Sequence, residues 1–163
     1  MVRAAIAEVR IGGEVFRVSE TVLVRCEDRV ESSVVRIAAL WEDHGVQYFA
    51  GHVYYRPEET RLGRLRDHEF HELFMTTNKI EGTVDAIDAH CTVKTWDEYQ
   101  VWLDEPIGND IGHSEEYECT FMCRASYDPF VDEFHPLGRA RTRAWSSAFP
   151  PDYGASRFDG WNL

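Results

Sequence analysis

The side chains with potential for metal binding or acid–base chemistry gather in two short stretches, and the first holds two cysteines. Cys119 and Cys123 are four positions apart in a β-prone run. Along a strand about 13 Å would separate them, at about 3.3 Å per residue. Two thiolates cannot reach one zinc ion over that distance, because each lies about 2.3 Å from the metal. We therefore expect buried thiols and no metal site.

The second stretch runs from His68 to Glu72 and reads His-Glu-Phe-His-Glu. It is not the His-Glu-x-x-His pattern of zinc proteases, because the second histidine comes one place early. We predict a solvated loop here. The sequence also has no Gly-x-Ser-x-Gly, phosphate-loop or Rossmann glycine pattern, and nothing pairs a nucleophile with an activating base. The prediction is a non-enzymatic protein without a cofactor.

Charge favours a basic partner. The chain has 29 acids against 17 bases, for a net charge of −12, and such a surface repels nucleic-acid phosphates. Eight acids and no base lie between Asp97 and Glu118. That stretch is either a solvated surface or a field complementary to a basic protein tail. DNA contact is expected to be weak at most, through Arg139, Arg141 and Arg143.

Length and composition indicate one globular domain of 163 residues, 44% of them hydrophobic. No apolar run approaches the roughly 20 residues that a membrane helix needs, so no membrane partner is expected. The N-terminus breaks its apolar run too early for a signal peptide. We expect a soluble, intracellular protein with reduced cysteines.

The elements that must position these residues are mostly strands. A β-prone run from residue 47 stops at Arg56-Pro57, because proline cannot donate to a sheet. A short helix is predicted near residues 96–102, and residues 71–75 are expected to form an edge strand. Trp41, Tyr48 and Tyr54 are expected in the core. The other predicted strands are 15–18, 21–25, 34–41 (in a hairpin with 47–55), 90–94 and 117–124. The pattern predicts an all-β fold, a partly open, distorted β-barrel with short helical segments.

Several motifs in order resemble the bromo-adjacent homology (BAH) domain over residues 14–137. They are Val22-Leu23-Val24-Arg25, Val35-Arg36-Ile37, Leu40-Trp41-Glu42-Asp43, Tyr54-Tyr55-Arg56-Pro57-Glu58-Glu59-Thr60, Glu72-Leu73-Phe74, Cys91-Thr92-Val93 and Cys123-Arg124-Ala125-Ser126-Tyr127-Asp128. The resemblance implies a barrel-like core that mediates interactions in nuclear chromatin proteins. Residues 1–13 would be an N-terminal extension. Residues 138–163 would be an arginine- and aromatic-rich extension, packed on the domain or docked on a partner.

The resemblance also implies where a methyl-lysine cage would lie. In the family members that read methylated histones, three aromatic positions correspond to Ser33, Val53 and Tyr55, and only Tyr55 is aromatic here. An Asp-His pair in the same members corresponds to Thr77 and Asn78. Each ring contributes on the order of 0.5–2 kcal/mol to binding a cation, so two losses remove most of the selectivity.

A substitute wall for this cage remains an alternative, from Phe49 or from the tail residues Trp145 and Trp161. The leading hypothesis is a module that binds a histone tail or nucleosome through acidic faces and a groove beside Tyr55. The first alternative is a scaffold that docks another subunit of a chromatin or replication complex. The second is a methyl-lysine reader with a rearranged cage.

Overall fold

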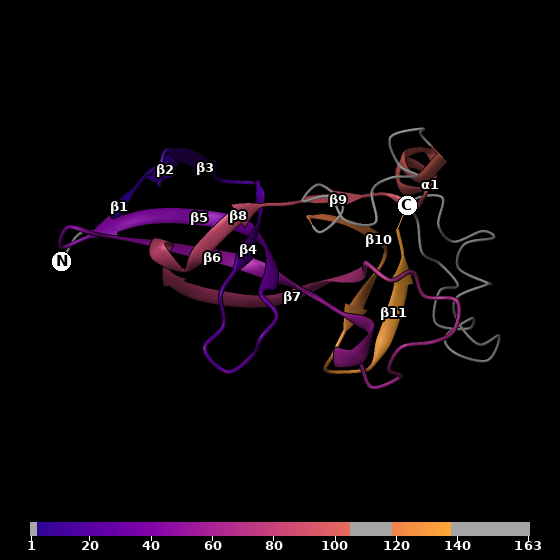
Figure 1. Cartoon of the computed structure of the whole chain (residues 1–163). Helices are drawn as coiled ribbons and strands as arrows, with labels where there is room; N and C mark the ends of the chain where they lie inside the picture. The colour runs from indigo at the N-terminus through magenta and orange to yellow at the C-terminus, as the bar shows by residue number, and fades with distance from the viewer. Residues whose placement is uncertain (1–2, 105–118, 138–163) are drawn as a thin grey trace. The chain divides into compact units, whose positions relative to one another are not determined.

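The structure, a computed structural model, describes residues 3–104 and 119–137. The chain divides into two compact units, one of residues 1–54 and 77–92, the other of residues 55–76 and 93–163. Two long strands, β6 (Val46–Tyr55) and β7 (Glu72–Thr83), contribute residues to both units (Figure 1). Each unit is described separately below.

The first unit is built from strands. Its hydrogen-bonded order is β8-β4-β5-β6-β7, and β1 adds to β5. Strands β2 and β3 form a separate hairpin (Figure 1). The bounds are β1 Ala4–Ala5, β2 Glu8–Ile11, β3 Glu14–Arg17, β4 Thr21–Val24, β5 Ser33–Asp43 and β8 Ile87–His90, with a 3₁₀ turn at Val84–Ala86.

The β5–β6 hairpin turns in two residues, His44 and Gly45, whose φ angles are 50° and 79°. Two successive positive φ values are typical of the type I′ turn, whose twist matches that of the paired strands. The turn sets Trp41 opposite Tyr48 and Val35 opposite Val53. The predicted hairpin is therefore confirmed.

Alternation along these strands fills the core of the first unit with aliphatic and aromatic side chains. They are Val9, Phe16, Val22, Val24, Val34, Val35, Ile37, Leu40, Phe49, Val53, Tyr54 and Ile87. The prediction that Tyr54 is a core residue is confirmed. Trp41 and Tyr48 are only half-buried, so their assignment to the core was wrong.

The second unit combines strands with the α-helix. Strand β10 (Thr120–Asp128) pairs in parallel with β7 along Glu72–Met75 and antiparallel with β11 (Glu133–Pro136). Strand β9 (Thr92–Lys94) also pairs with β10, and a 3₁₀ turn spans Pro57–Glu59. In the part of the chain that the structure describes, neither set of strands closes into a barrel. The predicted class, mainly β and partly open with short helices, is confirmed.

Helix α1 (Trp96–Asp104) confirms the helix predicted near residues 96–102. It begins with a capping box. The Glu98 N–H donates to Thr95 Oγ1 over 3.2 Å, and the Thr95 N–H donates to Glu98 Oε1 over 3.1 Å. Tyr99 and Trp102, one turn apart, pack on Met122 of β10.

Strand β7 was predicted as an edge strand of residues 71–75, and that prediction was wrong. It runs for twelve residues and has a neighbour on each side, β10 and β6. After Thr76 its side chains alternate between exposed and half-buried positions. The run Thr-Thr-Asn-Lys is too polar to stand out as a strand in the sequence.

A buried ion pair joins β7 to β10 in the second unit. The side chains of Glu72 and Arg124 are 0% exposed, and Arg124 donates to both carboxylate oxygens, over 2.7 and 2.9 Å. Arg124 also donates to the Asp67 carbonyl over 3.1 Å and stacks on Trp96, 4.5 Å from the ring centre. The Glu69 N–H donates to Glu72 over 3.0 Å. Burial raises the pKa of Glu72, and the Arg124 guanidinium opposes that rise.

These contacts correct the prediction of a solvated loop at residues 68–72. His68 is also buried, and its Nδ1 accepts the Leu65 N–H over 2.9 Å. Its ring packs edge-on against Phe74. Burial, with the charges of Arg124 and Arg64, lowers the pKa of His68 to about 4. The stretch is therefore a structural element of the second unit.

We predict that Arg124→Met lowers the free energy of unfolding by about 3–5 kcal/mol, because it leaves the Glu72 carboxylate buried and unpaired. Glu72→Gln, which leaves the guanidinium without its counter-charge, should also destabilise strongly. The double variant Glu72→Leu/Arg124→Met should lower the free energy of unfolding by much less than the sum of the decreases in the two single variants. Urea denaturation measures all three, and a loss below about 1 kcal/mol for Arg124→Met would contradict the assignment.

We also predict that acid destabilises the protein through His68. Between pH 6.5 and about 4 the unfolded chain binds a proton at this residue and the folded chain does not, so stability falls as the pH falls through this window. Urea midpoints at pH 7, 5.5 and 4.5 measure the slope. His68→Asn, which keeps an acceptor for the Leu65 N–H, should have a shallower slope than the wild type. Identical slopes would refute the role of His68.

Candidate functional site

Ser33, at the start of β5, stands where an aromatic wall would be needed for a methyl-lysine cage. It is buried, and its hydroxyl accepts a hydrogen bond from the Arg29 guanidinium. The Cys26 sulfur lies 3.1 Å from the same hydroxyl. Burial raises the pKa of Cys26, but hydrogen bonds with Ser33 and Arg29 outweigh this and lower it. A guanidinium held at this position repels a second cation, because like charges brought close together are destabilising.

The other cage-related positions in the first unit offer little aromatic surface. Val53 is buried, and Phe49 is only 1% exposed. Phe49 packs so closely on Gly82 that a Cβ atom added at position 82 would lie 3.2 Å from the Phe49 ring. Phe49 is thus enclosed in the core. Of the two β7 positions, Thr77 is exposed and Asn78 is half-buried.

Tyr55 belongs to the second unit, where it is half-buried beside another tyrosine. Its ring centre lies 6.0 Å from that of Tyr127, and it packs on the cluster formed by Phe74, Ala125, Tyr127 and Phe134. The Tyr127 hydroxyl donates to Asp132 over 2.8 Å and accepts the Arg61 N–H over 3.3 Å. Burial, together with the Asp132 carboxylate, raises the pKa of Tyr127. The surface at Tyr55 therefore offers one half-buried ring, backed by the buried Tyr127 ring and its hydrogen bond to Asp132.

The Arg-Pro-Glu-Glu corner after Tyr55 is a structural element. Pro57 starts the 3₁₀ turn, and the Thr60 hydroxyl donates to its carbonyl over 2.8 Å. The Arg56 guanidinium lies over the Phe121 ring, 5.7 Å from its centre. Glu58 pairs with Arg64. These contacts fix the direction of the chain as it leaves Tyr55.

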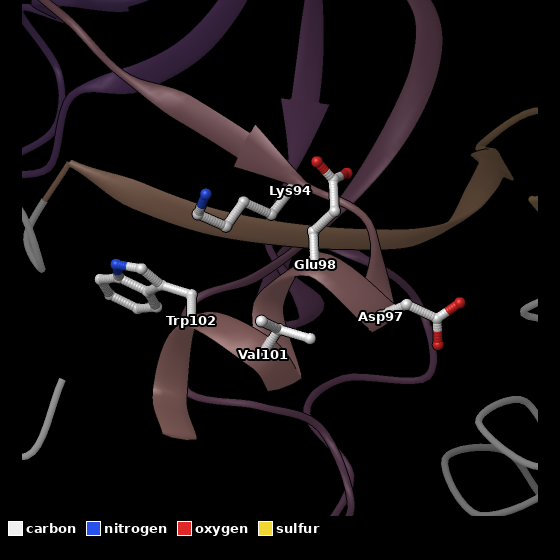
Figure 2. A pocket seen from close by; sticks show the side chains of 5 residues that line it. All are labelled: Lys94, Asp97, Glu98, Val101 and Trp102. Atoms are coloured by element: carbon white, nitrogen blue, oxygen red, sulfur yellow. The ribbon is translucent and has the colours of Figure 1, made fainter. Parts of the chain in front are cut away.

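An open groove of about 390 Å³ lies along α1 in the second unit (Figure 2). Its lining residues are Lys94, Asp97, Glu98, Val101 and Trp102. The two carboxylates are exposed, and so is 64% of Val101. Hydrogen bonding with Thr95 lowers the pKa of Glu98, so it is ionised at neutral pH. Such a groove can receive a basic side chain with an apolar stem.

The predicted acidic stretch 97–118 is described only in part. Asp97, Glu98 and Asp104 are exposed on α1, and residues 105–118 lie outside the described range. The predicted roles of Arg139, Arg141, Arg143, Trp145 and Trp161 also fall outside it. No group of three or more metal-ligating side chains occurs within residues 3–104 and 119–137. Over the same residues, no helix is long and apolar enough to span a membrane.

Sequence reasoning missed two features of the surface. One is the Arg29–Ser33–Cys26 cluster, because nothing in the spacing shows which side chain Arg29 contacts. The other is the stack of Trp41 on Tyr48, whose ring centres lie 5.8 Å apart with planes inclined by 15°. Their positions near the end of a predicted hairpin were the available signal, since side chains near a turn are less fully covered than those at mid-strand.

Comparisons with known proteins agree with this architecture. The family model of the BAH domain matches residues 14–137. The chain is 32% identical over 95 residues to origin of replication complex subunit 1A of Arabidopsis thaliana, a match that covers 57% of this chain and 10% of that protein. The fold is similar to the crystal structure of the yeast Rsc2 BAH domain, with a TM-score of 0.66 and 24% identity. That match covers 83% of this chain and 55% of the Rsc2 chain, so this chain spans only part of each relative.

Proposed function

Because this chain belongs to the BAH domain family, a family of chromatin-associated modules, we propose that it is a nuclear, non-enzymatic module that binds a histone tail or the nucleosome surface. The observation that carries the proposal is the α1 groove, where exposed Asp97 and Glu98 flank the apolar surface of Val101. The aromatic surface at Tyr55 adds a second contact for a basic chain.

The charge of the chain supports a basic protein partner over a nucleic acid. Its net charge is −12, and a histone tail is rich in lysine and arginine. Exposed carboxylates raise the association rate of a cationic chain and bias the choice of partner, and salt screens both effects. The apolar parts of the groove can bury the aliphatic stems of lysine or arginine, which adds contact that salt does not weaken.

The cage positions support binding that does not depend on methylation. A trimethylammonium group needs several aromatic faces, since it cannot donate a hydrogen bond. Here Arg29 donates to the Ser33 hydroxyl, and Val53 is aliphatic and buried. Tyr55 is half-buried and lies against the buried Tyr127 ring, so a rearranged cage in the second unit would rest on one accessible ring.

A scaffold function is the second candidate, in which the same surfaces dock a non-histone subunit of a chromatin or replication complex. The incomplete cage favours it, and one relative is named as a subunit of the origin of replication complex. Affinity purification of the chain from nuclei separates the two proposals. A single stoichiometric partner without histones would favour the scaffold.

We predict that Asp97→Asn/Glu98→Gln weakens binding of unmodified histone-tail peptides severalfold at about 50 mM salt and much less at about 300 mM. Glutamine at position 98 can still accept the Thr95 N–H, so the helix cap remains. Fluorescence polarisation with labelled peptides measures the affinities. Glu81→Gln, an exposed acid of the first unit, is the control and should bind as the wild type does. No binding of the wild type to any tail or nucleosome at low salt would refute the proposed function.

We predict that trimethylation of a histone lysine changes the affinity less than about twofold, because one or two rings add little for an exposed cation. A peptide array carrying matched unmodified and trimethylated tails measures this. A strong preference for one methylated site would favour the rearranged cage. In that case Tyr55→Ala should remove the preference and Tyr55→Phe should keep it.

A further inference from the structure

An aromatic surface in the first unit plays no part in the function proposed above. Trp41 of β5 and Tyr48 of β6 are directly opposite each other in the strand register and stack at 5.8 Å. Both are half-buried, so part of each ring is accessible. They lie near the two-residue turn of the hairpin, away from the cage positions Val53 and Tyr55 along β6.

A cation from the same chain already lies on this surface. The Arg3 guanidinium is 5.0 Å from the centre of the Trp41 ring. Arg3 comes just before β1, whose Ala4 and Ala5 pair with Glu42 and Trp41 of β5. The Ile6 N–H then donates to the Leu40 carbonyl over 3.0 Å. The segment Arg3–Ile6 therefore extends the sheet as a short strand beyond the reach of β4.

A carboxylate lies on the same strand as the Trp41 ring. Asp43 is two residues after Trp41, so it is on the same face of β5. The register pairs Ala4 with Glu42, and the same spacing continued by one residue would bring Arg3 level with Asp43. The Asp43 side chain is 21% exposed, and the imidazole of His44 lies 3.5 Å from it. An indole face with a nearby carboxylate is a favourable environment for a guanidinium.

The segment that fills this site is held weakly. Strand β1 has two residues, both exposed alanines, which bury little apolar surface against the sheet. An exposed cation–π contact contributes only a factor of about two to five in affinity. As a tethered competitor, the segment acts at an effective concentration on the order of millimolar. A free segment displaces it once the ratio of its concentration to its dissociation constant exceeds the same ratio for the tethered segment, so a free segment of equal intrinsic affinity needs a concentration on the order of millimolar.

We propose that the β5 edge at Trp41–Asp43, together with Tyr48, is a docking site for an extended, arginine-bearing segment of a protein partner. The segment adds to β5 as a strand in place of Arg3–Ile6 and sets its guanidinium on Trp41 beside Asp43. The Arg3 guanidinium already lies on Trp41 in this chain, so it shows that a guanidinium fits the site. A guanidinium suits the site better than a lysine ammonium, because it is planar, more weakly hydrated and stacks on aromatic faces. This proposal rests on the proposed function for the identity of the partner as a basic protein tail.

Strand addition explains why the small residues next to Arg3 matter. Main-chain hydrogen bonds to the β5 edge provide affinity, and alternate side chains provide specificity. In this structure alanines occupy the two positions after the arginine. A partner segment with the order arginine, small, small, apolar would reproduce the contacts of Arg3–Ile6.

The test uses the whole chain labelled with ¹⁵N and a capped synthetic peptide, Val-Arg-Ala-Ala-Ile-Ala, which copies residues 2–7. The indole N–H signal of Trp41, identified with Trp41→Phe, should shift as the peptide is added. Arg3→Ala should strengthen peptide binding about two- to fivefold, because it weakens the internal competitor. Tyr48→Leu and Trp41→Ala, both followed through backbone amide signals, should weaken binding about two- to fivefold. Phe130→Ala, which alters an exposed ring of the second unit, should change nothing.

Peptides with lysine or trimethyllysine in place of arginine should bind more weakly than the parent peptide. A preference for trimethyllysine would overturn the assignment of a guanidinium. An unchanged Trp41 signal at millimolar peptide in the Arg3→Ala chain, with circular dichroism confirming that it is folded, would overturn the site itself.

Histone-tail peptides tested in parallel separate this inference from the proposed function. If tails bind and Tyr48→Leu binds them as tightly as the wild type, the docking site is refuted and the proposed function stands. If no tail or nucleosome binds but the synthetic peptide shifts Trp41, the site is real and the proposed function fails.

Discussion

The second unit depends on the buried pair of Glu72 and Arg124. A charge removed from water costs several kcal/mol, and it is tolerated only when its partner and its remaining hydrogen bonds are all in place. Arg124 therefore needs the carboxylate on β7, the Asp67 carbonyl and the Trp96 face together. These contacts tie the chain before β7, the parallel pair β7–β10 and the start of α1 into one arrangement. The α1 groove is positioned by this network, although none of its carboxylates takes part in it.

Charge is used in two opposite ways in this chain. In the core of the second unit the ion pair is fully enclosed, so its contribution is geometric and insensitive to salt. Acids outnumber bases in the chain, and the acids of α1 (Asp97, Glu98 and Asp104) are exposed. Exposed carboxylates cost little to maintain, because water solvates them until a basic partner arrives. The enclosed pair thus stabilises the second unit, and the exposed acids are the ones that the proposed function uses.

The parts of the fold that sequence reasoning predicted are those with a local cause. The β5–β6 hairpin follows from alternation around His44-Gly45, the strand end from Pro57, and α1 from the Thr95–Glu98 capping box. The failures depend on residues distant in the sequence. Glu72 looked solvated because its partner is 52 positions away, and β7 looked like an edge because its neighbour β10 comes much later. The family resemblance, now confirmed, was the basis for assigning the cage positions to residues of this chain. It could not show that the Arg29 guanidinium donates to the Ser33 hydroxyl.

Under the proposals above, these surfaces select a protein partner by its charge and by strand pairing. A methyl-lysine cage needs several aromatic faces, yet the positions that the resemblance assigns to it hold Ser33, which accepts from Arg29, and the buried Val53. Part of the ring surface at Trp41, Tyr48 and Tyr55 is accessible, and Asp43 lies two residues after Trp41 on β5. A carboxylate beside an aromatic face favours a cation that also donates hydrogen bonds, and a guanidinium does this while a trimethylammonium does not. Under the proposed function, these surfaces therefore fit arginine and overall basicity better than lysine methylation.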